Sequence, residues 1–166
     1  MTQTLTTDAV ERVIRASPED IYAIVSDITR TPELSPEVIR VRWIRGATGP
    51  EVGARFLAIN SLGRIWTWPN FPVVITAEPG REFAISRTEP FFGTLEWRYH
   101  LLPQGEGNTL VTESYTVTRP LTRVAWFILE KLIGSTDRAG ELRSGMAITL
   151  ERLAELVEHP VPPSQS

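Results

Sequence analysis

The chain has 166 residues, 42% of which are hydrophobic, and its 17 basic against 20 acidic side chains give a formal net charge of −3 at pH 7. A chain of this length buries enough surface to fold as one domain without disulfides or structural metals. Because no excess of positive charge is available to neutralise phosphates, we expect no nucleic acid among its partners.

Cysteine is absent, which removes disulfides and thiol nucleophiles and suits a reducing compartment. The first eight residues lack the basic and apolar regions of a signal peptide. The longest apolar helical run, residues 124–129, is far shorter than the roughly 20 residues of a membrane span. We therefore expect a cytoplasmic protein with no stable membrane span, formed by a single domain over residues 1–159. Residues 160–166 have the composition of a disordered tail.

The first expected elements are a strand over residues 8–15 and a short helix after it. Ser17 stands at the N-cap position, Pro18 at the first helical position and Asp20 three residues after the cap, a combination typical of helix starts. This helix should run to about residue 27. A second short helical or turn segment near residues 30–34 is bracketed by prolines at positions 32 and 36, which disfavour helix at the residue before them.

Strands predominate between residues 38 and 118, where β-branched and aromatic residues come in runs separated by turn clusters. Six strands are expected there: residues 38–45, 54–60, 64–76 (broken by Pro69 and Pro72), 82–87, 94–102 and 109–118. Short turns between successive strands imply an antiparallel meander, because parallel neighbours need much longer crossovers. With the first strand, the sheet has about seven strands.

Beyond residue 120 the apolar period becomes helical. Apolar residues from Leu142 to Val157 recur at spacings of three and four, with charged residues on the other side. A helix over residues 138–158 would be roughly 30 Å long, enough to lie across the sheet. The expected class is therefore α+β, with one long C-terminal helix against a curved antiparallel sheet.

This order of elements is that of the helix-grip fold, and the local sequence agrees. Residues 17–27, SPEDIYAIVSD, resemble the opening of SRPBCC, or START-like, proteins, and residues 35–37 follow where their WSPev segment stands, with Leu34 replacing the usual tryptophan. Residues 52–56, 77–83, 97–99 and 111–114 resemble a bacterial subgroup of the polyketide cyclase/dehydrase and lipid transport family. The resemblance spans about residues 8–158. It implies a curved sheet wrapped around the last helix, with two short helices after the first strand, and it brings no agreed catalytic residues.

Alternate residues of a strand share a face, so the phase that carries the large apolar groups indicates which side chains point inward. The residues expected to line an internal cavity are Phe56, Asn60, Trp66, Trp68, Phe83, Arg87, Trp97, Tyr99 and Tyr115. A cavity lined mainly by rings with a few polar groups is typical of a small-molecule site, so we expect an apolar ligand with a polar handle. The alternative for each ring is ordinary packing against the long helix.

Glu113 shares the inward phase with Tyr115, which would place a carboxyl among rings. Desolvation there would raise its pKa, as a general acid or base requires, so Glu113 is the candidate catalytic residue. The alternative is a structural pairing of Glu113 with Arg87 or another basic group. Arg87 and Asn60 are candidates for binding a ligand carbonyl or carboxylate, although Arg87 could equally face solvent.

Other catalytic constellations are not found in the sequence. The two histidines, His100 and His159, support neither a Ser-His-Asp arrangement nor a multi-histidine metal site. The glycines between residues 46 and 53 do not match the phosphate-cradling motifs. We expect no metal and no cofactor.

The segment from Leu121 to Ile133 contains a run, residues 124–129, that is apolar on all sides of a helix. Such a helix must be covered. The cover is the rest of the chain, a second copy in a homodimer, or a membrane contacted transiently while a lipid passes.

Three functions are consistent with these patterns. The first is binding or transport of a small hydrophobic ligand, lipid or polyketide-like, in an enclosed cavity, and the enclosed fold and the missing nucleophile–base pair favour it. The second is a polyketide aromatase/cyclase or dehydratase that uses Glu113, or Tyr99 and Tyr115, as acid and base. The third is a protein-interaction or stress-related module that uses the helix around Trp126.

Overall fold

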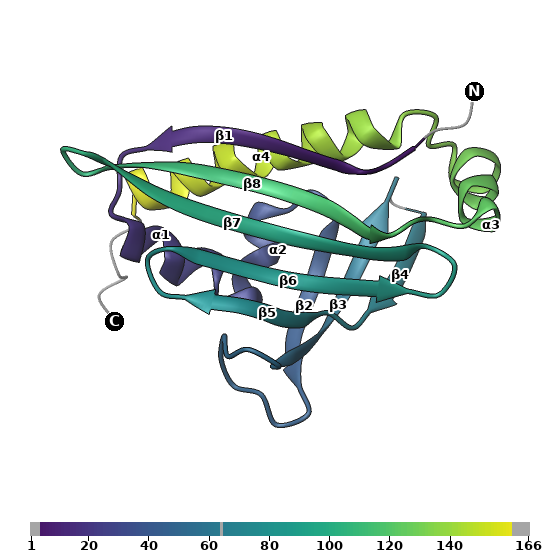
Figure 1. The fold of residues 1–166 in the computed structure, drawn as a ribbon, viewed down its shortest axis with the longest axis horizontal. Coiled ribbons are helices and arrows are strands. Elements are labelled where there is room, and N and C mark those ends of the chain that lie inside the picture. The colour runs from purple at the N-terminus through teal and green to yellow at the C-terminus, as the bar shows by residue number, and fades with distance from the viewer. Residues whose placement is uncertain (1–3, 64, 161–166) are drawn as a thin grey trace.

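The computed structural model describes residues 4–63 and 65–160. Its strands are β1 (Thr7–Ile14), β2 (Val38–Ile44), β3 (Arg55–Leu62), β4 (Trp66–Asn70), β5 (Val73–Glu78), β6 (Glu82–Glu89), β7 (Gly93–Gly105) and β8 (Asn108–Arg119). Its helices are α1 (Pro18–Val25), a 3-10 turn (Ile28–Arg30), α2 (Thr31–Leu34), α3 (Arg123–Phe127), a π-helical segment (Ile128–Ile133) and α4 (Arg138–Glu158). Figure 1 shows α4 running along one face of the curved sheet.

All pairings in the sheet are antiparallel, as the short turns predict. The order is β1-β8-β7-β6-β5-β3-β2, a path of seven strands, and β4 pairs with β3 off this path. The expected helix-grip arrangement is therefore confirmed.

The structure differs from the prediction where one strand was expected over residues 64–76. Residue 64 lies outside the described residues, and the remainder forms two strands, β4 and β5, separated at Phe71 and Pro72. Pro72 has no N–H to donate to a ladder, which favours a break there. Pro69 is accommodated within β4 because β4 pairs only with β3 and is an edge strand.

The helix starts follow the sequence signals. The Ser17 side chain caps α1 by accepting from the Asp20 N–H at 3.1 Å. The Asp137 side chain caps α4 in the same way, accepting from the Gly140 N–H at 3.0 Å. The expected helix over residues 138–158 is confirmed with the same bounds.

Two apolar clusters pack beneath α4. The first joins Leu150 and Leu153 of α4 to α1 and to the inner face of the sheet, including Phe83. The second joins Leu142 and Met146 to Leu5, Leu95 and Tyr115. The cavity described below is lined by members of both clusters.

The segment from Leu121 to Ile133 is helical from Arg123 onward and is only partly covered. Ala125 and Leu129 are buried, while Val124, Phe127 and Leu132 are each more than half exposed. One side of the segment thus packs on the chain itself. In the part of the chain that the structure describes, no helix combines the length and the apolar character needed to cross a bilayer. The tail expected over residues 160–166 lies, apart from Pro160, outside the described residues.

Candidate functional site: a cavity between the last helix and the sheet

A cavity of about 130 Å³ lies between α4 and the inner face of the sheet, with α2 and the loop after it forming a further wall. Its walls are mainly apolar. The sheet contributes rings, among them Phe56, Phe83 and Trp97, and α4 contributes Leu142 and Met146. We call this space the inner cavity.

Three buried polar side chains line the inner cavity, and each leaves one atom without a hydrogen-bond partner. They are Asn60 of β3, Asn70 of β4 and Glu113 of β8, all at most 5% exposed. The unpartnered atoms are Asn60 Nδ2, Asn70 Oδ1 and Glu113 Oε2. Most buried polar groups in proteins are paired, and leaving one unpaired costs about 1–3 kcal/mol. Three side chains that line one mainly apolar cavity therefore each hold an unused hydrogen-bonding atom.

The orientation of Asn70 is set by its neighbours. Its Nδ2 donates to Glu89 Oε1 at 3.1 Å, and since a carboxylate only accepts, the free atom is the acceptor Oδ1. Trp68 Nε1 donates to the same oxygen at 3.3 Å, and Arg87 Nε lies 3.3 Å from it. Arg87 thus pairs with Glu89, and the structural pairing with Glu113 considered for it is not formed.

Glu113 and Tyr99 face each other across the β7–β8 ladder. The Tyr99 hydroxyl donates to Glu113 Oε1 at 3.2 Å. Burial raises the pKa of Glu113 to about 8, and the hydrogen bond from Tyr99 offsets only part of this rise. Burial, together with the adjacent Glu113, also raises the pKa of Tyr99 well above its ordinary value. Near neutral pH the Glu113 carboxyl is mainly protonated and is itself a hydrogen-bond donor.

The family model for polyketide cyclase / dehydrase and lipid transport matches residues 6–158. The chain belongs to this family. None of the curated proteins compared with it matches. Because the family includes carriers as well as enzymes by its own description, membership by itself does not select between them.

Solved structures share the fold of this chain at low identity. A START superfamily protein from Mycobacterium smegmatis is 21% identical over 95% of this chain and 100% of that chain, with a TM-score of 0.68. The di-domain aromatase/cyclase StfQ from the steffimycin biosynthetic pathway is 14% identical, with a TM-score of 0.71 over 92% of this chain and 51% of that chain. Truncated norcoclaurine synthase from Thalictrum flavum is 17% identical, with a TM-score of 0.65 over 97% of this chain and 99% of that chain. These likenesses show the fold.

Most of the side chains that the sequence predicts to face a cavity line the inner cavity. They are Phe56, Asn60, Phe83, Arg87, Trp97, Tyr99 and Glu113. Trp66 and Trp68 instead line a second cavity of about 310 Å³, which we call the outer cavity. It lies between β4, the β6–β7 turn and the segment from Leu121 to Ile133.

Tyr115 lines neither cavity. It has the inward phase that the sequence predicts, but it lies two residues farther along β8, where its ring packs on Trp97 with 5.5 Å between centroids. There it belongs to the core with Leu142 and Met146. For this ring the packing alternative is the one that the structure supports.

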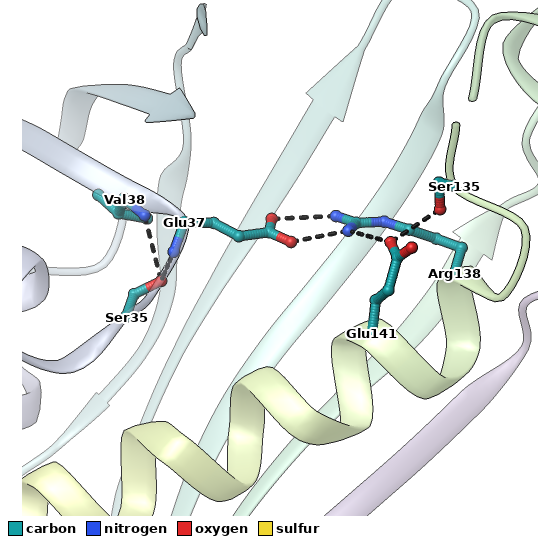
Figure 2. A network of polar contacts seen from close by, with 6 residues as sticks. All are labelled: Ser35, Glu37, Val38, Ser135, Arg138 and Glu141. Atoms are coloured by element: carbon teal, nitrogen blue, oxygen red, sulfur yellow. Dashed lines mark hydrogen bonds and ion pairs between the residues drawn. The ribbon is translucent and has the colours of Figure 1, made fainter. Parts of the chain in front are cut away.

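Two features of the site were missed from the sequence. The first is Asn70, which shares the alternate positions of β4 with Trp66 and Trp68. This alternation could have identified Asn70, but Pro69 and Pro72 made the strand hard to recognise in the sequence. The second is an ion-pair network that ties α4 to the start of β2 (Figure 2). Its Glu37 is too far from Arg138 in sequence for any local pattern to join them.

In that network Arg138 is buried and bidentate to Glu37, at 2.7 and 3.0 Å, and also donates to Glu141 at 3.2 Å. Ser135 Oγ donates to the same oxygen of Glu141 at 2.7 Å. Burial disfavours the charge on Arg138, but the hydrogen bonds to Glu37 and Glu141 outweigh it and hold the pKa of Arg138 above its ordinary value. Figure 2 shows the guanidinium between the two carboxylates, above the first turn of α4.

Proposed function

We propose that this chain binds, and in that way carries or stores, a small and largely hydrophobic molecule in the inner cavity. The observation that carries the proposal is the set of three unpartnered polar atoms on side chains that line a mainly apolar cavity. A ligand that completes their hydrogen bonds recovers the free energy that the empty site forgoes, and it adds the burial of its own apolar surface.

The three atoms describe the polar handle of the ligand. Asn60 Nδ2 and the protonated Glu113 both donate, whereas Asn70 Oδ1 accepts. Complementary groups are a carbonyl or ether oxygen facing the two donors and a hydroxyl facing the acceptor. Polyketide-like ketones and phenols carry both, which supports them over pure hydrocarbons.

Replacing Asn60 by leucine tests this proposal, because the change removes an unpaired polar group. We expect Asn60→Leu to raise the free energy of unfolding by about 1 kcal/mol without ligand and to weaken binding of phenols and ketones at least tenfold. Urea denaturation and titration calorimetry measure the two effects.

Thr109→Val is the matched control. Thr109 is as buried as Asn60, but its hydroxyl is satisfied, donating to the Ala16 carbonyl at 2.8 Å, and it lies outside the cavity walls. This variant should lose stability and keep its affinity. If Asn60→Leu were destabilising and bound ligand normally, water or protein would already satisfy the amide and the proposal would fail.

A second candidate function is acid–base catalysis on a bound polyketide-like chain, as in a cyclase or dehydratase. The specific observation in its favour is the buried Glu113–Tyr99 pair on the cavity wall, with the pKa of Glu113 near 8. A proton donor at neutral pH suits dehydration or enolisation of a ketone.

Glu113→Gln separates the two functions. In an enzyme, turnover of a polyketide thioester should be lost while binding of apolar ligands persists. The wild-type rate should fall as pH rises through about 8 if Glu113 donates the proton, and rise if it accepts one. A wild-type rate retained in the variant, or a rate independent of pH across this range, would remove the acid–base role.

A further inference from the structure

The inner and outer cavities are separated by a narrow set of side chains. Arg87 of β6 and Leu142 of α4 line both cavities. The inner cavity alone, at about 130 Å³, is close in size to the engineered cavity of about 150 Å³ that holds benzene, so it accommodates one ring. A lipid or polyketide needs more room than that.

Ion pairs lie on both sides of this boundary. On the sheet side, Arg87 pairs with Glu89, which lines the outer cavity. On the helix side, Arg138 lines the outer cavity and its partner Glu37 lines the inner one. We call these four side chains and Leu142 the neck.

The two cavities differ in chemistry. All three side chains that carry an unpartnered polar atom line the inner cavity. The outer cavity has aliphatic walls, among them Leu5, Leu95, Leu121, Ile128, Leu129 and Ile133, together with the rings of Trp66, Trp68 and Phe92. Its charged side chains, Arg87, Glu89 and Arg138, are already held in the ion pairs of the neck. One end of the combined space is therefore suited to a polar handle and the other to a hydrocarbon.

The charges around the neck discriminate among ligands. Among the residues that the structure describes, three carboxylates, those of Glu37, Glu89 and Glu141, are paired with two guanidiniums, those of Arg87 and Arg138. An anionic ligand passing the neck would meet this excess of negative charge and would compete with partners already paired. A neutral ligand meets neither cost.

We propose that the two cavities form one site for a neutral amphiphile, with a ketone- or phenol-bearing ring in the inner cavity and an apolar tail that passes the neck into the outer cavity. This inference rests on the proposed binding function and adds the orientation, the size class and the charge of the ligand. The helical segment from Leu121 to Ile133 is then the roof over the tail.

A series of 4-alkylphenols, from methyl to octyl, tests the proposal on the unmodified chain by titration calorimetry at pH 7. Each methylene that enters the outer cavity should tighten binding about fourfold, the equivalent of about 0.8 kcal/mol, until the cavity is full. 4-Octylbenzoate, which carries a carboxylate in place of the hydroxyl, should bind at least tenfold more weakly than 4-octylphenol.

A variant that blocks the neck tests whether the alkyl tail of the ligand passes into the outer cavity. In Leu142→Trp the affinity should no longer rise with chain length, so 4-methylphenol and 4-octylphenol should bind this variant equally. The matched control is Ile148→Trp, on the same helix at a partly exposed position outside both cavities, and it should keep the full gain.

The outcomes separate this inference from the proposed function. If 4-methylphenol binds and longer chains bring no gain, the two-cavity site is overturned while the inner-cavity site stands. A gain that survives Leu142→Trp would place the tail on the exposed surface, and equal binding of 4-octylbenzoate would overturn the charge selection. If no phenol or ketone binds at all, the proposed function fails as well.

Discussion

At the scale of single residues, the inner cavity concentrates polar groups that are costly to bury. Glu113 is the extreme case, since one oxygen accepts from Tyr99 and the other has no partner. Its ordinary pKa of 4.5 rises to about 8 because burial penalises the charged form. An apolar side chain at this position would avoid that cost, so the buried carboxyl indicates a functional role for Glu113.

The raised pKa of Glu113 predicts how stability depends on pH. The folded state holds this proton up to pH 8 and the unfolded state releases it near pH 4.5, so the free energy of unfolding falls as pH rises between these values. The loss is roughly 3–5 kcal/mol at about 1.4 kcal/mol per pKa unit. Urea denaturation at pH 5 and pH 8.5 measures it.

Glu113→Gln should remove most of that pH dependence, and the variant should be the more stable protein at pH 8.5. Glu151→Gln, at an exposed position of α4, is the matched control and should leave the wild-type profile unchanged. A wild-type profile that is flat between pH 5 and 8.5 would show that Glu113 titrates normally.

At the scale of elements, the Arg138–Glu37 pair fixes the N-terminal end of α4 against the start of β2. Arg138→Met leaves two carboxylates facing each other without their cation. We expect a loss of about 3 kcal/mol in the free energy of unfolding, because breaking one side of a buried pair is costly.

Arg143→Met is the control for that variant, since Arg143 pairs with Asp8 on the other side of the helix and its side chain is 59% exposed. Its loss should be below about 1 kcal/mol. Equal losses in the two variants would show that the Arg138 network contributes no more than a surface ion pair.

The elements themselves were predictable where a local signal was strong. The cap at Ser17 predicted the start of α1, and the apolar period predicted the bounds of α4. Alternation predicted the inward faces of β7 and β8, because the Tyr99–Glu113 stretch of their ladder is free of bulges. The break at Pro72 was harder, since a proline is tolerated within an edge strand and disruptive elsewhere. The Arg138 network and the outer position of Trp66 depend on contacts between distant segments, which no local pattern encodes.

At the scale of the whole molecule, the sheet and α4 do not close into one solid core. Two apolar clusters pack beneath the helix, and the inner cavity is lined by both. Unfilled internal volume costs stability, so a ligand that fills it should stabilise the fold as a whole. The half-covered segment from Leu121 to Ile133 lies at one end of the molecule (Figure 1), where it lines the outer cavity.

The most direct test of the account is a titration of the wild-type chain with a panel of small phenols and ketones, followed by tryptophan fluorescence and thermal unfolding. Trp97 lines the inner cavity, so its emission should change saturably. A ligand present at a hundredfold excess over its Kd should add about 2.7 kcal/mol to the free energy of unfolding. Ala58→Leu, which fills the inner cavity from its own wall, should abolish both responses without unfolding the protein. No response across the panel, or the same response in Ala58→Leu, would contradict a ligand site between α4 and the sheet.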